Sequence, residues 1–361
     1  MSLTRRISAG FILSLILFGF IAPSWASLTA LIFIADIQGD VELKRTDASN
    51  YKKANLADLL DPSDQLKLDV SASAKIQCDN LDVKSVPAGE VSLVSDICDE
   101  EEQPITRPGP LQGTLRSPND AIPYVISPRN TALINGCPTL HWNNVEGANN
   151  YTVGIRGGGL EWQTETSDTQ IGKDDYPCNE ILQPGIRYLV IVETDTGESS
   201  ETEQGVSIRF NILDEEQVST LSTRITQLVQ HNLSPDLEQL ARAHLYQDNN
   251  LNTEAIELLE RLVQQGSQFT ATYLLLGDLY LQVGLIPFAR QPYLKGLELA
   301  QQSDDWAGQA TLQAGLGEVE YSMGNNSEAR RWLTNAKESY AILGNRSAVE
   351  ELEEWINVNL R

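Results

Sequence analysis

Cysteine, methionine and histidine are scarce in this chain of 361 residues, which contains four Cys, two Met and three His. No Cys-x2-Cys pair occurs, and His141, His231 and His244 lie in different segments, so the spacing of a zinc site is missing. The sequence also lacks a phosphate-binding loop, a dinucleotide-binding fingerprint, a serine nucleophile elbow and a metalloprotease HExxH motif. We therefore expect no enzyme activity, no metal and no cofactor.

Basic residues are also few compared with acidic ones. Lys and Arg number 26 against 50 Asp and Glu, which gives a formal net charge of −24 at pH 7. Phosphate would be repelled over much of such a surface, so we expect no nucleic-acid partner. The same charge argues against docking on anionic lipid, and solubility outside the cell is its simplest explanation.

Long apolar runs are confined to the N-terminus. Arg5 and Arg6 precede an uncharged apolar run over residues 9–22, and small residues follow up to Ala26. This order is that of a secretory signal peptide, which we assign to residues 1–26. The sequence therefore predicts export to the periplasm or the cell exterior, with no membrane span after cleavage.

An uncleaved membrane anchor is the alternative to cleavage. The apolar run at residues 28–34 would bring the N-terminal segment closer to the roughly 20 residues that a membrane-spanning helix needs. We interpret this second run as the first strand of the mature protein.

Export makes the cysteines informative, because they fall into two pairs. In an oxidising compartment, an even number clustered in this way predicts one disulfide in each of two domains. Each bridge would close a loop of a few tens of residues and contribute ~3 kcal/mol. The expected pairs are Cys78 with Cys98 and Cys137 with Cys178.

Short alternating runs separated by Gly, Pro and Asp predict a small antiparallel β domain over residues 27–98. Val91, Leu93 and Ser95 are expected on its last strand. The run 35–43, Ala-Asp-Ile-Gln-Gly-Asp-Val-Glu-Leu, resembles the start of the FecR-like domain of exported cyanobacterial proteins. After it, residues 99–120 are rich in acid, Pro and Gly and predict an extended linker.

Six alternating runs with turns at short spacing predict a β-sandwich over residues 121–213. The segment 138–142, Pro-Thr-Leu-His-Trp, resembles a fibronectin type III or immunoglobulin-like domain. That resemblance implies that Trp142 lies in the core and that Tyr188 makes a corner hydrogen bond. Trp162 is expected in the core, with a sugar-stacking platform as its alternative role.

Residues 214–361 contain a repeat. In each copy a small residue on one helix precedes an alanine on the next by twelve positions. Small residues let two helices cross closely, and larger apolar residues three and four apart fill the space between them. The three pairs are Ala243 with Ala255, Gly277 with Ala289, and Gly317 with Ala329.

The clearest copy resembles the tetratricopeptide repeat (TPR) in its sequence Tyr273, Leu276, Gly277, Tyr280, Ala289 and Tyr293. The resemblance implies an α-helical solenoid that binds a partner and ends in a capping helix. The fold class predicted for the whole chain is multidomain β + α, with the small β domain first, the β-sandwich second and the solenoid last.

In tetratricopeptide proteins the first helix of each repeat lines a concave groove. Mapped by position, the candidate peptide-groove residues are Leu240, His244, Asp248, Leu274, Asp278, Leu281, Glu318 and Tyr321. This lining is apolar with acidic residues near its middle, and it has no Lys or Arg to pair with a carboxylate. We therefore expect a neutral or basic peptide segment as the partner, with Asp278 and Glu318 exposed to it.

The sequence thus predicts an exported protein-binding or scaffold protein with a protein or peptide partner in the cell envelope. The alternative is an envelope sensor or a wall- or glycan-binding protein that uses its β domains, with the helices as a spacer.

Overall fold

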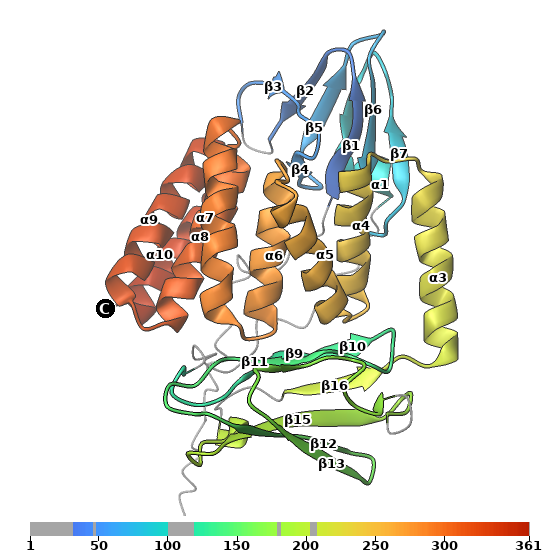
Figure 1. Ribbon diagram of the computed structural model, residues 1–361. Helices are drawn as coiled ribbons and strands as arrows, with labels where there is room; N and C mark the ends of the chain where they lie inside the picture. Colours follow the sequence, from blue (N-terminus) through green and yellow to red (C-terminus); the bar gives the residue numbers. More distant parts are fainter. Residues whose placement is uncertain (1–31, 46–47, 100–118, 179–181, 203–207, 361) are drawn as a thin grey trace, which may run out of the picture.

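The computed structural model describes residues 32–45, 48–99, 119–178, 182–202 and 208–360 (Figure 1). The predicted signal peptide and most of the predicted linker lie outside these residues. Within them, strands occupy the N-terminal part and helices the C-terminal part, so the predicted β-then-α order is observed. None of the described helices is both long and apolar enough to cross a membrane.

The first β region (residues 32–99) contains two sheets of four strands, ordered β4-β1-β6-β7 and β3-β2-β5-β8. The pairings between adjacent strands are antiparallel. The strands are β1 (Ile32–Gln38), β2 (Val41–Lys44), β3 (Lys52–Lys53), β4 (Leu59–Leu60), β5 (Gln65–Leu68), β6 (Ser73–Gln77), β7 (Val83–Val86) and β8 (Val91–Leu93), followed by helix α1 (Val94–Cys98).

Alternation puts one side of each sheet into a shared core. Val41 and Leu43 of β2 and Leu66 and Leu68 of β5 are buried, whereas the residues between them are not. Cys98 at the end of α1 forms the predicted disulfide with Cys78 after β6. The last predicted strand is shorter than expected, because α1 begins directly after Leu93 and contains Ser95.

The second β region (residues 119–213) contains a five-stranded sheet, β10-β16-β15-β12-β13, and a three-stranded sheet, β14-β11-β9. Here β10 pairs with β16 in parallel and the other pairings are antiparallel. The strands are β9 (Val125–Ser127), β10 (Thr131–Leu133), β11 (Leu140–Trp142), β12 (Tyr151–Gly157), β13 (Leu160–Thr166), β14 (Gln170–Ile171), β15 (Arg187–Thr194) and β16 (Arg209–Ile212).

Both sheets of the second β region contribute to one buried cluster. Trp142 is 1% exposed and its ring packs edge-on against Tyr151. The Tyr188 hydroxyl accepts a hydrogen bond from the backbone N–H of Gln183, five residues earlier, at 2.8 Å. Trp162 is half-buried against this cluster beside Tyr176. The predicted disulfide between Cys137 and Cys178 is also present.

The helical array (residues 215–359) consists of consecutive helices that run up and down. They are α3 (Glu215–Gln230), α4 (Pro235–Asp248), α5 (Asn252–Gln264), α6 (Thr270–Gln282), α7 (Ile286–Gln302), α8 (Trp306–Ser322), α9 (Asn326–Leu343) and α10 (Arg346–Asn359). Each helix from α4 to α10 packs against the one before it.

The six turns that join α4 to α10 share one local structure, which three of them illustrate. The α4–α5, α6–α7 and α8–α9 turns each have a residue in the left-handed region at their centre: Asn250, Gly284 and Gly324, with φ of 58°, 79° and 81°. In each turn, the N–H of the next residue donates to a carbonyl five residues earlier, which satisfies an otherwise unpaired group at the helix end. The segment around Asn250 is thus a turn between α4 and α5.

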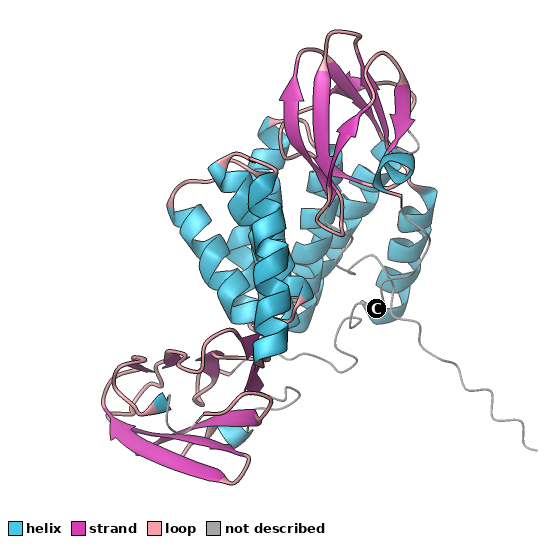
Figure 2. Ribbon diagram, turned by 90° about the vertical axis from the view of Figure 1, so that its right-hand side faces the viewer, coloured by secondary structure: helices cyan, strands magenta, loops and turns pink. Residues whose placement is uncertain are grey.

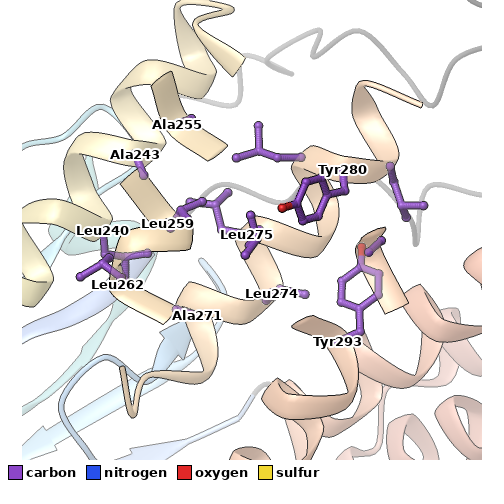
Figure 3. Packing of buried hydrophobic residues seen from close by; sticks show 14 of the residues in the cluster. Leu240, Ala243, Ala255, Leu259, Leu262, Ala271, Leu274, Leu275, Tyr280 and Tyr293 are labelled. Atoms are coloured by element: carbon purple, nitrogen blue, oxygen red, sulfur yellow. The ribbon is translucent and has the colours of Figure 1, made fainter. Parts of the chain in front are cut away.

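The small residues of the twelve-residue spacing lie where consecutive helices cross. Ala243 and Ala255 are fully buried between α4 and α5 (Figure 3). A methyl group added to Gly277 on α6 would overlap the Tyr293 ring on α7, and one added to Gly317 on α8 would overlap Leu333 on α9. Close helix approach at these positions therefore requires glycine.

The two β regions lie on opposite sides of the helical array, at opposite ends of its helices, as Figures 1 and 2 both show. The first β region joins the array through Arg45, whose guanidinium lies 2.8 Å from Asp64 and 3.5 Å from Asp305 in the α7–α8 turn. The second β region is bound at the other helix ends. There, the Ala132 N–H donates to the Asn250 carbonyl at 2.7 Å.

We predict that Gly277→Ala destabilises the protein by about 1–3 kcal/mol in urea unfolding, because the added methyl group overlaps a fully buried tyrosine. This overlap should outweigh the gain of roughly 1 kcal/mol in helix propensity. Gly136→Ala is the control, since its methyl group would meet Ile212 at an ordinary 3.4 Å. Equal stability of the two variants would contradict the close crossing.

Candidate binding surface on the inner helices

We use the term inner helices for α4, α6 and α8, the first helices of the three predicted repeats. Neighbouring inner helices contact each other, α4 with α6 and α6 with α8. The side chains of Gln247 and Gln282 join the first two through a hydrogen bond of 3.2 Å. The candidate residues predicted from the sequence lie on these three helices, and their exposure differs along the array.

On α4 the predicted groove residues are covered by the chain itself. Leu240 and His244 are 0% exposed. Phe33, Ala35 and Ala57 of the first β region belong to the same buried cluster as Leu240. A partner therefore cannot reach Leu240 or His244 in this structure.

Residues of the β6–β7 turn lie next to His244 and help to bury it. The Nε2 atom of His244 lies 3.5 Å from Oδ1 of Asp79 in this turn and 3.6 Å from Oδ1 of Asp248 on its own helix. Leu81, in the same turn, shares a buried cluster with Leu245 and Leu251. Of the candidate residues on α4, only Asp248 is exposed.

On α6 the apolar candidates are buried and the acidic one is half-buried. Leu274 and Leu281 are 6% and 8% exposed and belong to the core of the array. Asp278 lies between them in sequence and accepts a hydrogen bond of 2.6 Å from the Tyr293 hydroxyl of α7. Asp278 and Glu318 of α8 are both half-buried, so the expectation that they are exposed is not met.

Tyr293 reaches Asp278 through a gap between two inner helices. Its ring lies against Gly277 of α6 and Gly315 of α8, where an added methyl group at either glycine would come too close. Burial, followed by the negative charges of Asp278 and Glu318, raises the pKa of Tyr293 well above its usual range. The phenol therefore stays protonated and continues to donate to Asp278.

Glu318 of α8 is the second half-buried acid of this surface. Burial, and next the neighbouring Asp278 carboxylate, raise the pKa of Glu318 to about 7. Two acids on adjacent inner helices thus share a partly dehydrated environment, in which the second negative charge is costly. We refer to Asp278, Tyr293 and Glu318 as the acidic cluster.

Tyr321 lies one helical turn beyond Glu318 and is half-buried. Its ring packs edge-on against Trp355 of α10, with 4.8 Å between the ring centres. Asp278, Glu318 and Tyr321 are therefore the candidate residues that combine partial exposure with a position on α6 or α8. The structure does not bring them together with Leu240 and His244 into one open surface.

Sequence reasoning missed Tyr293 as part of this surface. The repeat pattern includes Tyr293 but does not link its hydroxyl to Asp278. The signal was present in the sequence, because Gly277 and Gly315 both lack the side chain that would otherwise fill its place. In the described residues no group of three or more His, Cys, Asp or Glu side chains could hold a metal ion.

No protein-family model matches this chain, and no curated protein matches it.

The raised pKa of Glu318 predicts a loss of stability as the pH rises. Between the ordinary pKa of 4.5 and about 7, the folded protein keeps a proton that the unfolded chain has released. Folding is therefore favoured less at pH 8 than at pH 5. We expect Glu318→Gln to match the wild type at pH 5 and to exceed its unfolding free energy at pH 8 by roughly 1–3 kcal/mol.

Urea unfolding at both pH values measures this effect. Glu338→Gln is the matched control, because Glu338 is an exposed acid on α9. The control should lose as much stability between pH 5 and pH 8 as the wild type. If Glu318→Gln also loses the same amount, Glu318 does not carry a raised pKa.

Proposed function

We propose that this protein is an exported, non-enzymatic scaffold whose tetratricopeptide-like solenoid binds a neutral or basic peptide segment of an envelope partner. The observation that carries the proposal is the acidic cluster on the inner helices. The repeated turn geometry and the glycine crossings support a solenoid, because the same helix–turn–helix unit recurs along the array.

The chemistry of the acidic cluster favours a cationic side chain. A Lys or Arg placed near Asp278 and Glu318 would relieve the unfavourable interaction between the two acids. Because Glu318 is already partly dehydrated in the free protein, its attraction to a cation is screened less than on an open surface. A single basic residue within an otherwise neutral segment fits this requirement.

Apolar contacts for the rest of the segment lie next to the cluster. Tyr321 lies one helical turn after Glu318 on α8, its ring packs against Trp355 of α10, and both aromatic residues are only partly buried. Aromatic residues of this kind supply large contact area at low entropic cost. The surface proposed for the partner is therefore formed by α6, α8 and α10, and excludes Leu240 and His244.

Other observations support the fold assignments and the compartment proposed for the two β regions. Two sheets with a shared core support a β-sandwich for residues 121–213, and the resemblances support a FecR-like and a fibronectin type III-like assignment. Both regions contain one disulfide, which fits an oxidising compartment such as the periplasm or the cell exterior. In this proposal both β regions pack against the helical array, and the first β region covers the predicted groove residues Leu240 and His244 of the first repeat.

A peptide-display selection against the exported chain tests the proposal. We expect enriched peptides to contain a Lys or Arg flanked by apolar residues. The double variant Asp278→Asn, Glu318→Gln should bind them about tenfold more weakly, because both charges are removed. Asparagine at position 278 can still accept the Tyr293 hydrogen bond, so the fold should be kept.

The matched control is Glu298→Gln, Glu338→Gln, which removes two exposed charges from α7 and α9. It should bind the selected peptides like the wild type. Binding by the wild type should also strengthen from pH 6 to pH 8, because a cation selects the ionised form of Glu318. Equal weakening by both double variants would show that only net charge matters and would remove the cluster as the site.

A further inference from the structure

The outer face of the sheet β3-β2-β5-β8 collects positive charge in an acidic protein. Strand register places Lys53, Glu42, Lys67 and Val91 in one row across the sheet. Lys44, Gln65 and Leu93 form the next row. These residues alternate with the buried Val41, Leu43, Leu66 and Leu68, so they lie on the side of the sheet away from the core.

Tyr51 lies across this face. The Nζ atoms of Lys67 and Lys44 are 5.3 Å and 5.9 Å from the centre of its ring. Its hydroxyl donates to Oε1 of Gln65 at 2.9 Å. The lysines are therefore held near an aromatic ring, where cation–π attraction orients them.

The face is accessible and includes apolar surface. The Lys67 side chain is 47% exposed, and Lys53 is exposed. Val91 is 51% exposed and Leu93 is 36% exposed. Exposed aliphatic residues beside lysines and a tyrosine suit a partner that offers both apolar and anionic groups.

We propose that this basic sheet face, formed by Lys44, Tyr51, Lys53, Lys67, Val91 and Leu93, binds an acidic polysaccharide with repeated carboxylate groups. Pyranose rings present apolar C–H faces that can lie on tyrosine and aliphatic side chains. Their carboxylates would pair with the lysines, and their hydroxyls with Gln65.

The shape of the face favours an extended polymer over a small ligand. A sheet surface spreads its side chains over neighbouring strands about 4.8 Å apart and does not enclose a ligand. Several weak contacts along a chain can then add to a useful affinity. Charge complementarity selects an anionic chain, because the two rows contain three lysines and one acid, Glu42, so the face keeps a net positive charge even with Glu42 paired to Lys67 at 2.6 Å.

The basic sheet face is separate from the acidic cluster of the helical array. The basic sheet face belongs to the first β region, whereas the acidic cluster lies on α6, α7 and α8. The protein could therefore attach to a glycan through one part and hold a peptide through another. A negative result in the peptide test would not contradict glycan binding, and a negative result in the glycan test would not contradict peptide binding.

The test measures binding of the full exported chain to polygalacturonate in calcium-free buffer. Fully methyl-esterified polygalacturonate serves as the uncharged polymer, and polyacrylate as a polyanion without sugar rings. We expect binding to polygalacturonate that weakens as salt is raised, because exposed charges are screened. The methyl ester should not bind, and polyacrylate should bind at least tenfold more weakly.

The variant Lys53→Ala, Lys67→Ala should weaken polygalacturonate binding about tenfold. The matched control is Lys75→Ala, Lys173→Ala, which removes the same charge from the other sheet and from the second β region. The control should bind like the wild type. Thermal unfolding of both variants establishes that they are folded.

Four outcomes would overturn the proposal. They are the absence of polygalacturonate binding, equal weakening by both double variants, polyacrylate binding as tight as polygalacturonate, and binding to phosphatidylglycerol vesicles without binding to the polymer. Equally tight binding of polyacrylate would show that the face binds any polyanion. Binding to vesicles alone would show that the face contacts lipid.

Discussion

The packing of Tyr293 between two glycines is the constraint on which the centre of the helical array depends. A tyrosine ring fits between α6 and α8 because Gly277 and Gly315 leave space for it. Tyr293 is fully buried, and its hydroxyl donates a hydrogen bond from α7 to Asp278 on α6. That hydrogen bond fixes one carboxylate beside Glu318, so the charge arrangement of the inner helices follows from a packing requirement.

Local features of the sequence predicted much of the fold. The twelve-residue spacing of small residues identified the helix pairs, because close crossing of two helices restricts side-chain size at the contact itself. The cysteine pairs were also predictable, since export and proximity in sequence leave few ways to join them. The alternating runs located the strands, except that α1 replaces the end of the last strand around Ser95.

Contacts between distant parts of the chain were not predictable in the same way. His244 occupies a groove position by its place in the repeat, but its burial depends on Asp79 of the first β region. Helix caps show a similar limit. Ser234 precedes Pro235 at the start of α4, yet its side chain makes no capping hydrogen bond, whereas Asp305 caps α8 through the Gly308 N–H. Capping depends on a side-chain rotamer that residue type alone does not determine.

The hydrogen bonds between the second β region and the helices have a consequence for how the protein can be divided. The Ile134 N–H donates to the Glu254 carboxyl at 2.8 Å, and buried Arg129 donates to the Val283 carbonyl at 2.6 Å. Both bonds cross the sequence boundary near residue 214. A recombinant fragment starting there would expose the ends of α5 and α6 and would leave Glu254 without its donor. Proteolytic cleavage at this boundary would therefore not release two intact domains, and the β region and the helices are expected to unfold as one cooperative unit.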